Sequence, residues 1–234
     1  MSPIVGLAPS LNRMTPRVIP VIVLLAALGS GCGGSSSQHS ATERASELPD
    51  PQTYAATLDA RERYWWQQPK RVVELLDCAP GMTVVDLGAG TGYFLPYLSS
   101  AVGPSGQVLA LDVERAMVDM MVQRVRRDRL LNVSPGVVPP DDPALTPRSV
   151  DRVLVVNTWH HLNDRVAYAE KLLHALRPGG LVLIVDFDEE SPKGPPVEMR
   201  LTPSTVVAEL ESAGFSAELL EESIPYQYAI AGRR

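Results

Sequence analysis

Cysteine and histidine are scarce in this chain, whose 234 residues include two cysteines, Cys32 and Cys78, and four histidines. Two cysteines cannot form the disulfide framework that holds many small secreted domains together. The spacing of the cysteines and histidines does not match a zinc site with four such ligands, so no metal site is predicted. We expect Cys78 to be a buried small hydrophobic residue rather than a nucleophile.

An excess of basic residues is absent as well. Asp and Glu outnumber Lys and Arg by 27 to 21, which gives a formal net charge of -6. Proteins that bind DNA or RNA usually carry a basic patch or stripe, so nucleic acids are not expected as partners. The hydrophobic fraction of 45% and the charged fraction of 21% are typical of a soluble globular protein, and we expect small molecules or lipids as partners.

The N-terminal segment has the composition of an export signal. Arg13 and Arg17 precede an eleven-residue apolar run over residues 18–28. A membrane-spanning helix needs about 20 apolar residues, whereas the core of a signal peptide has about 7 to 15. The small residues that end in Cys32, followed by a Gly/Ser-rich stretch, resemble a bacterial lipoprotein signal, in which the cysteine is lipidated and becomes the mature N-terminus. We therefore expect a cell-envelope protein that is anchored to the membrane by lipid and faces the periplasm.

The lipoprotein motif is imperfect, which leaves alternatives open. Its leucine usually stands three residues before the cysteine, where this chain has Gly29, and Leu28 is one position further back. Cleavage after Gly29 would release a soluble periplasmic protein, and a signal that fails would leave the chain in the cytoplasm. Under the lipoprotein interpretation the chain divides into a signal peptide with the lipidated cysteine (1–32), a flexible Gly/Ser linker (33–52) and a folded domain (53–234). The sequence makes no prediction of the oligomeric state.

Helical and strand patterns alternate from about residue 53 onward. Strands that alternate with helices of about 10 to 15 residues indicate βαβ units and a parallel sheet. The last two strand patterns have no helix between them, which predicts a hairpin. The predicted fold is therefore α/β, a doubly wound sheet of seven strands that is mostly parallel and has a C-terminal antiparallel β-hairpin. The predicted strands cover residues 83–87, 107–111, 132–138, 150–156, 181–187, 216–220 and 226–231, and the predicted helices cover 54–66, 69–76, 92–101, 115–127, 164–176 and 202–213.

A glycine-rich motif lies between the first predicted strand and the helix that follows it. Residues 84–94 have the sequence VVDLGAGTGYF, and in an open α/β sheet such a turn lies at the carboxyl edge of the strands, where ligands bind. Gly88 and Gly90 can adopt positive φ and allow a ligand to approach the backbone. The helix predicted to begin near Gly92 offers backbone N–H groups to a carboxylate. Several classes of nucleotide-binding protein share a GxG turn, so the turn alone does not identify the ligand.

Two residues narrow the choice of ligand. The NAD fingerprint requires a third glycine where this chain has Tyr93, and it does not call for an acid before the turn, where this chain has Asp86. An acid there can bind an ammonium group, which S-adenosylmethionine carries and NAD lacks at that end. Asp112 ends the next predicted strand, 20 residues after Gly92, which is the separation expected of an acid that binds the ribose hydroxyls. The alternative for Asp112 is a helix N-cap before residues 114–121.

These residues resemble the pattern of the class I S-adenosylmethionine-dependent methyltransferases over residues 60–230, especially the branch that includes the ubiquinone/menaquinone biosynthesis methyltransferases. That family has an acid before GxGxG, an acid at the tip of the second strand, an acid after the third strand that contacts the adenine amino group, and a Pro-Gly-Gly turn before the fifth strand. The resemblance implies a Rossmann-like fold, S-adenosylmethionine as cofactor, and an adenine contact from Asp141, with Asp142 as the second candidate. The Pro-Gly-Gly turn is matched by residues 178–180. The cofactor-binding residues predicted in this way are Asp86, Gly88, Ala89, Gly90, Gly92, Asp112, Asp141, Asp142 and Asn157.

The acceptor side of the site has fewer markers. His160 and His161 follow the fourth predicted strand at the carboxyl edge, where either residue could be a general base that removes a proton from an oxygen or nitrogen nucleophile. The alternative is that they cap the next helix or pack in the core. The aromatic cluster of residues 64–66 either covers the cofactor as a lid, with its ring faces toward the sulfonium, or packs on the sheet.

The predicted function is transfer of a methyl group from S-adenosylmethionine to a small-molecule or lipid-like acceptor. Because this cofactor is made in the cytoplasm and the signal directs the chain outward, an alternative has to be kept. It is an exported domain that binds S-adenosylmethionine or a related nucleoside without catalysis.

Overall fold

The computed structural model describes residues 51–221 and 224–234. The predicted signal peptide with Cys32 and nearly all of the predicted linker lie outside the described residues, so these stay predictions. No helix within the described ranges is long and apolar enough to cross a membrane.

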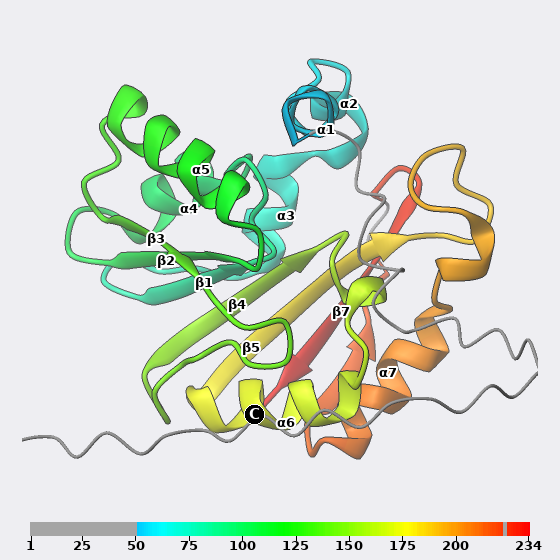
Figure 1. Ribbon diagram of the computed structural model, residues 1–234. Helices are drawn as coiled ribbons and strands as arrows, with labels where there is room; N and C mark the ends of the chain where they lie inside the picture. The colour runs from blue at the N-terminus through cyan, green and yellow to red at the C-terminus, as the bar shows by residue number, and fades with distance from the viewer. Residues whose placement is uncertain (1–50, 222–223) are drawn as a thin grey trace, which may run out of the picture. The chain divides into compact units, whose positions relative to one another are not determined.

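The strands form one seven-stranded sheet in the order β3-β2-β1-β4-β5-β7-β6 (Figure 1). Strands β1 to β5 are parallel to one another, whereas β7 runs antiparallel between β5 and β6. This arrangement confirms the predicted α/β fold, with its mostly parallel sheet and C-terminal antiparallel hairpin. The strands are β1 (Thr83–Leu87), β2 (Gln107–Asp112), β3 (Val133–Val137), β4 (Val150–Val156), β5 (Leu176–Phe187), β6 (Ser216–Leu219) and β7 (Gln227–Arg233).

Helices cover both faces of the sheet, as a doubly wound fold requires (Figure 1). Side chains alternate between the two faces along a strand, so Val84 packs in the core beneath α3 and α4, while Val85 packs in the core beneath α6 and α7. Both faces of the central strands are therefore apolar. The helices are α1 (Pro51–Leu58), α2 (Arg63–Gln67), α3 (Pro69–Leu75), α4 (Leu95–Val102), α5 (Arg115–Asp128), α6 (Arg165–Ala175) and α7 (Pro203–Ser212), with the short 3-10 helices η2 (Trp159–His161) and η3 (Val197–Met199).

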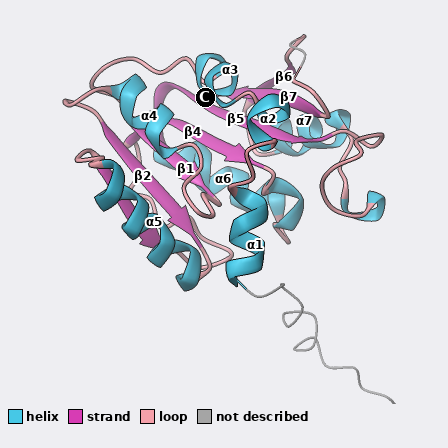
Figure 2. Cartoon of the chain, turned by 90° about the horizontal axis from the view of Figure 1, so that it is seen from above, coloured by secondary structure: helices cyan, strands magenta, loops and turns pink. Residues whose placement is uncertain are grey.

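The prediction of one continuous helix over residues 54–66 is wrong, because the chain turns between α1 and α2. Arg63 Nη1 donates to the backbone carbonyl of Leu58 at the end of α1 (2.8 Å). Asp59 Oδ1 accepts from Thr91 Oγ1 (2.8 Å) and from an arginine of α5 (2.6 Å). These contacts hold the turn against the glycine-rich loop, and Figure 2 shows α1 and α2 beside the carboxyl ends of β1 and β4.

Helix α4 begins at Leu95, three residues later than predicted. Gly92 has a φ of +81°, which lies outside the helical region. The backbone N–H groups that follow β1 therefore belong to an open loop rather than to the first turn of a helix.

Candidate functional site

A cavity of about 380 Å³ opens at the carboxyl edge of β1, β2 and β4. The loops that follow β1, β2, β3 and β4 make most of its wall, and residues of α1, α2, α5 and α6 complete it. Among the residues predicted to bind the cofactor, the cavity is lined by Gly88, Ala89, Gly90, Asp112 and Asn157. The other lining residues are Leu58, Arg63, Leu87, Val113, Glu114, Ala116, Met117, Val138, Pro140, Val156, Thr158, His161, Leu162 and Tyr168.

The glycine-rich loop is held tightly against its neighbours. The backbone N–H groups of Gly88 and Ala89 donate to the carbonyl of Leu111 at the end of β2 (2.8 and 3.0 Å). Gly88 has a φ of +69°, and a Cβ there would lie 2.3 Å from the hydroxyl oxygen of Thr158. Only glycine fits this position, since a side chain would meet both backbone strain and a neighbouring atom.

Asp112 holds the same loop from the tip of β2. Its Oδ2 accepts from the Gly90 N–H (2.8 Å) and its Oδ1 accepts from the Glu114 N–H (2.9 Å). Burial raises the pKa of Asp112, while the backbone N–H groups of Glu114, Gly90 and Val113 oppose that rise. The N-cap of α5 is Glu114, so Asp112 does not cap this helix, and its carboxyl group lines the cavity.

Asp86 lies beneath the loop rather than in the cavity wall. Its side chain is buried, with the residue 2% exposed. Its Oδ2 has no hydrogen-bond partner among the described residues. Burial raises the pKa of Asp86 to about 7, a rise that Arg63 opposes and Asp112 reinforces. A buried carboxyl oxygen without a partner is unusual in a folded protein and suits a group that is satisfied only when a ligand binds.

Arg63 is a site residue that sequence reasoning missed. It is 7% exposed, lines the cavity and lies with its guanidinium carbon 4.2 Å from the centre of the Tyr93 ring. Its Nε and Nη2 donate to Gln67 Oε1, each at 3.2 Å. The signal in the sequence is the spacing of Arg63 and Gln67, which stand on either side of the aromatic cluster. Residues four positions apart are neighbours on one helix face.

The aromatic cluster itself does not line the cavity. Trp65 is 77% exposed, and the ring of Trp66 lies 5.8 Å from that of Phe187. The cavity lining supports the packing alternative for the cluster, and the residues of this region that line the cavity are Leu58 and Arg63.

Four residues predicted to bind the cofactor lie outside the cavity lining, namely Asp86, Gly92, Asp141 and Asp142. The carboxyl group of Asp142 accepts from the Ala144 N–H (2.8 Å) and pairs with Lys171 (3.5 Å), and Asp141 is exposed. Val138 and Pro140 line the cavity after β3 in their place. Gly92 also lies outside the lining, where a Cβ would come within 2.5 Å of the Leu95 side chain.

The two histidines have different environments although they are adjacent. His160 is buried, and its Nδ1 lies 2.8 and 2.9 Å from the two carboxyl oxygens of Asp186, with both side chains 3% exposed. The centre of the His161 ring lies 4.1 Å from that of His160, and His161 lines the cavity. Burial lowers the pKa of His161, and the neighbouring His160 lowers it further, while Asp186 opposes the change. The surroundings of His160 thus fit a residue packed in the core, and those of His161 fit a general base that faces the cavity. Asp186 was not predicted.

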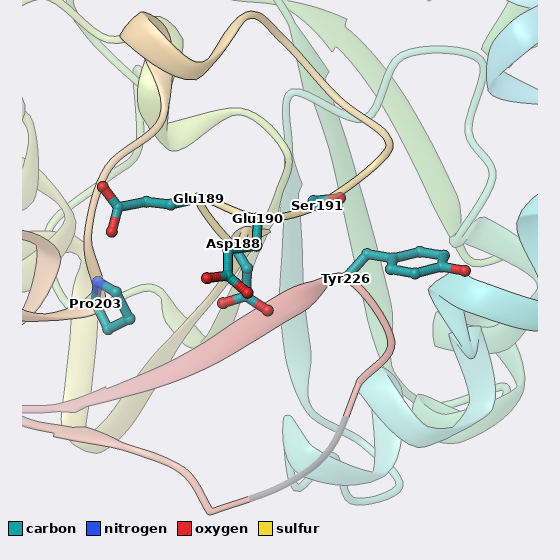
Figure 3. A pocket seen from close by; sticks show the side chains of 6 residues that line it. All are labelled: Asp188, Glu189, Glu190, Ser191, Pro203 and Tyr226. Atoms are coloured by element: carbon teal, nitrogen blue, oxygen red, sulfur yellow. The ribbon is translucent and has the colours of Figure 1, made fainter.

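A second cavity of about 410 Å³ lies beyond the end of β5 (Figure 3). It is lined by Asp188, Glu189, Glu190, Ser191, Pro203 and Tyr226. None of the residues predicted for the site lies in its wall. The predicted chemistry therefore belongs to the first cavity.

Comparison with known proteins agrees with this geometry. A family model described as a methyltransferase domain matches residues 84–180. An uncharacterized 37.1 kDa protein in transposon TN4556 of Streptomyces fradiae is 31% identical over 152 residues, which cover 62% of this chain and 41% of that protein. The ubiquinone/menaquinone biosynthesis C-methyltransferase UbiE of Hydrogenovibrio crunogenus is 27% identical over 128 residues, which cover 51% of this chain and 48% of that protein. The chain spans less than half the length of these two curated relatives.

A solved structure matches over a longer range. The crystal structure of a SAM-dependent methyltransferase from Aquifex aeolicus has a TM-score of 0.74 and 30% sequence identity, and the match covers 80% of this chain and 99% of that one. This chain belongs to the family of class I S-adenosylmethionine-dependent methyltransferases. The cofactor of this family is S-adenosylmethionine. The site suits it, because Arg63 in the cavity wall and the unpartnered Oδ2 of Asp86 near it complement an amino-acid group that carries both charges.

Proposed function

We propose that this methyltransferase transfers a methyl group to a small-molecule or lipid-like acceptor at the mouth of the cavity that Gly88, Asp112 and Asn157 line. The observation that carries the proposal is the unpartnered, buried carboxyl oxygen of Asp86 beneath the glycine-rich loop. Burying a polar atom without a partner costs free energy. A ligand that brings an ammonium group to this place removes that cost.

Each part of the cavity has a proposed role in holding the cofactor. Asp86 binds the ammonium group and Arg63 binds the carboxylate, since Arg63 lines the cavity and its charge is close enough to Asp86 to lower the pKa of that carboxyl group. Asp112 accepts from the ribose hydroxyls, because it lines the cavity at the tip of β2. Val138 and Pro140 offer an apolar surface to the adenine, and Asp141 and Asp142 stay candidates for contacts with its amino group.

His161 is the proposed general base. When bound, S-adenosylmethionine supplies a methyl group on a sulfonium, which is already activated for transfer to a nucleophile. The chain then has to align the acceptor and exclude water. The lowered pKa of His161 keeps its ring neutral at pH 7, so the ring can take a proton from a hydroxyl or amine of the acceptor.

The cofactor assignment is tested by isothermal titration of the full chain with S-adenosylmethionine, S-adenosylhomocysteine and NAD. We expect S-adenosylhomocysteine to bind in the micromolar range, about -8 kcal/mol, and NAD not to bind. Asp112→Ala is expected to weaken S-adenosylhomocysteine binding by about 1.5 to 3 kcal/mol, as for hydrogen bonds to a charged group. Asp119→Ala, on the exposed side of α5, is the control and should leave the affinity unchanged.

Other outcomes of this titration are equally informative. Tighter binding of NAD would contradict the cofactor assignment. An Asp112→Ala variant that binds normally but melts at a lower temperature would mean that Asp112 only supports the loop and the start of α5. Binding of S-adenosylhomocysteine without methyl transfer to any of a panel of hydroxyl, amine and carbon acceptors would favour the domain that binds without catalysis.

We further propose that Cys32 is lipidated, which would place the domain and a lipid-like acceptor at the same membrane. Each buried methylene of an acyl chain contributes about 0.8 kcal/mol to membrane binding. Mass spectrometry of the membrane fraction should find acylated Cys32 as the mature N-terminus, and the Cys32→Ala variant should lack that modification. A mature N-terminus at Ser30 in the soluble fraction, or an intact Met1 in the cytoplasm, would disprove the anchor.

A further inference from the structure

Three side-chain amides close a hydrogen-bonded ring beside the cofactor cavity. Gln67 Nε2 donates to Gln227 Oε1 (2.7 Å), Gln227 Nε2 donates to Asn157 Oδ1 (2.5 Å), and Asn157 Nδ2 donates to Gln67 Oε1 (3.2 Å). Gln67 ends α2, Asn157 follows β4 and Gln227 begins β7. The ring therefore joins three segments that are far apart in the sequence, and Asn157 also lines the cavity.

The ring is buried and its direction is set by Arg63. Gln67 is fully buried and Gln227 is 3% exposed, so each amide depends on its neighbours for hydrogen bonds. A guanidinium has donors and no acceptor, which means that the atom of Gln67 facing Arg63 Nε and Nη2 has to be the oxygen. Once the Gln67 amide is oriented, the other two can each donate and accept in only one sense around the ring.

The ring in turn limits where the guanidinium of Arg63 can lie. Gln67 Oε1 holds two of its nitrogens, the carbonyl of Leu58 accepts from the third, and the Tyr93 ring lies against it. An arginine side chain otherwise has many rotamers, and ordering it costs about 1.5 to 2 kcal/mol. Here contacts within the chain itself order the side chain, and the ordered group forms part of the cavity wall.

We propose that Gln67, Asn157 and Gln227 are positioning residues that hold Arg63 ready for the carboxylate of the cofactor, so that the methyltransferase selects ligands with an amino-acid group over nucleosides that lack one. This inference rests on the proposed cofactor cavity, in which Arg63 faces the amino-acid end. A ring with only a structural role would stabilise the fold and affect all adenosine ligands alike. A positioning ring affects only the ligand that reaches Arg63.

The test compares two ligands that differ in the amino-acid group. S-adenosylhomocysteine carries it, and 5′-methylthioadenosine has the same adenosine and sulfur without it. Gln67→Met fills a similar volume with a flexible apolar side chain and removes the amide. We expect this variant of the full chain to bind S-adenosylhomocysteine at least tenfold more weakly than the unmodified chain, and 5′-methylthioadenosine with unchanged affinity.

Three further substitutions test the amide ring independently of Gln67→Met. Gln227→Met breaks the ring from β7 and should produce the same selective loss, and it replaces Gln67→Met if that variant fails to fold. Gln123→Met, at an exposed position of α5, should change neither affinity. In a double-mutant cycle, Gln67→Met should cost nothing further once Arg63→Met is present, because the two residues act through one interaction.

The outcomes separate this inference from the proposed function. Equal weakening of both ligands by Gln67→Met, or unchanged binding of S-adenosylhomocysteine, would overturn the positioning role while leaving the cofactor assignment in place. Failure of the unmodified chain to bind S-adenosylhomocysteine would instead overturn the proposed function itself.

Discussion

Replacing Asp86 with asparagine is expected to weaken S-adenosylhomocysteine binding by roughly a hundredfold at pH 8, about 3 kcal/mol, the lower end of the cost of breaking a buried ion pair. Asparagine keeps the shape of the side chain and removes the charge that the ammonium group of the ligand needs. The folded protein without ligand should become more stable at the same pH, because the variant no longer buries an ionised carboxyl group that has an oxygen without a partner.

The direction of the Asp86 pKa shift determines how stability and ligand affinity depend on pH. Burial raises the pKa of Asp86 from 3.8 to about 7, so the folded state favours the neutral acid. The contribution of Asp86 to the free energy of unfolding is largest below its ordinary pKa. It decreases as the pH rises from about 4 toward 7 and stays low above 7. Binding shows the opposite trend, because the ligand needs the ionised form. The affinity of the unmodified chain should be about tenfold lower at pH 6 than at its plateau above pH 8.

Titration calorimetry and thermal melts between pH 5.5 and 8.5 test the predicted pH dependence of affinity and of stability. Asp86→Asn should remove the pH dependence of affinity and raise the melting temperature at pH 8 by roughly 3 to 8 °C, equivalent to about 1 to 2 kcal/mol for a domain of this size. Asp119→Asn, at an exposed pair on α5, should do neither. A variant with the same pH slope as the unmodified chain would show that another group controls the affinity.

The fold was predictable because its signals are local. Strands β1 and β4 have the predicted bounds residue for residue, since a strand buried on both faces is a short apolar run and β1 ends in a glycine-rich turn. Asp112 was identified for the same reason, as an acid at the end of such a run. The hairpin of β6 and β7 followed from the absence of a helix between two strand patterns.

The missed features depend on contacts between distant parts of the chain. Arg63 and Gln67 look like surface residues of a short helix until Gln227, 160 positions further along the chain, closes the amide ring. The break between α1 and α2 depends on Asp59, whose partner Thr91 is 32 positions away. Local helix propensity carries no information about such partners, which is why one continuous helix was expected there.

The histidine pair shows a second limit of the sequence. Adjacent residues in a 3-10 helix point in different directions, and no pattern in the sequence says which one faces the cavity. His160 is directed to Asp186, which lies opposite Tyr228 in the pairing of β5 with β7. His161 is left at the cavity wall. The structure thus gives the two residues different surroundings, and the proposed roles follow from this difference.

The two roles predict opposite results for two substitutions. Asp186→Ala removes one partner of a buried pair and should destabilise the fold by about 3 to 5 kcal/mol, lowering the melting temperature by roughly 10 °C. His161→Gln changes a more exposed residue and should leave the melting temperature and S-adenosylhomocysteine affinity nearly unchanged. It should lower the rate of methyl transfer to hydroxyl or amine acceptors by about a hundredfold or more, the typical contribution of a general base.

Transfer of radiolabelled methyl from S-adenosylmethionine to a panel of such acceptors measures this loss. The rate of the unmodified chain should fall as the pH drops below the pKa of His161, which lies below the ordinary value of 6.5, since the protonated ring cannot accept a proton. The His161→Gln variant should lack that dependence, and His174→Gln, at an exposed position of α6, should retain it. If His161→Gln transfers methyl groups at the unmodified rate across this pH range, His161 is not the base. If His160→Gln loses transfer while keeping the melting temperature, the base is the buried histidine that Asp186 holds.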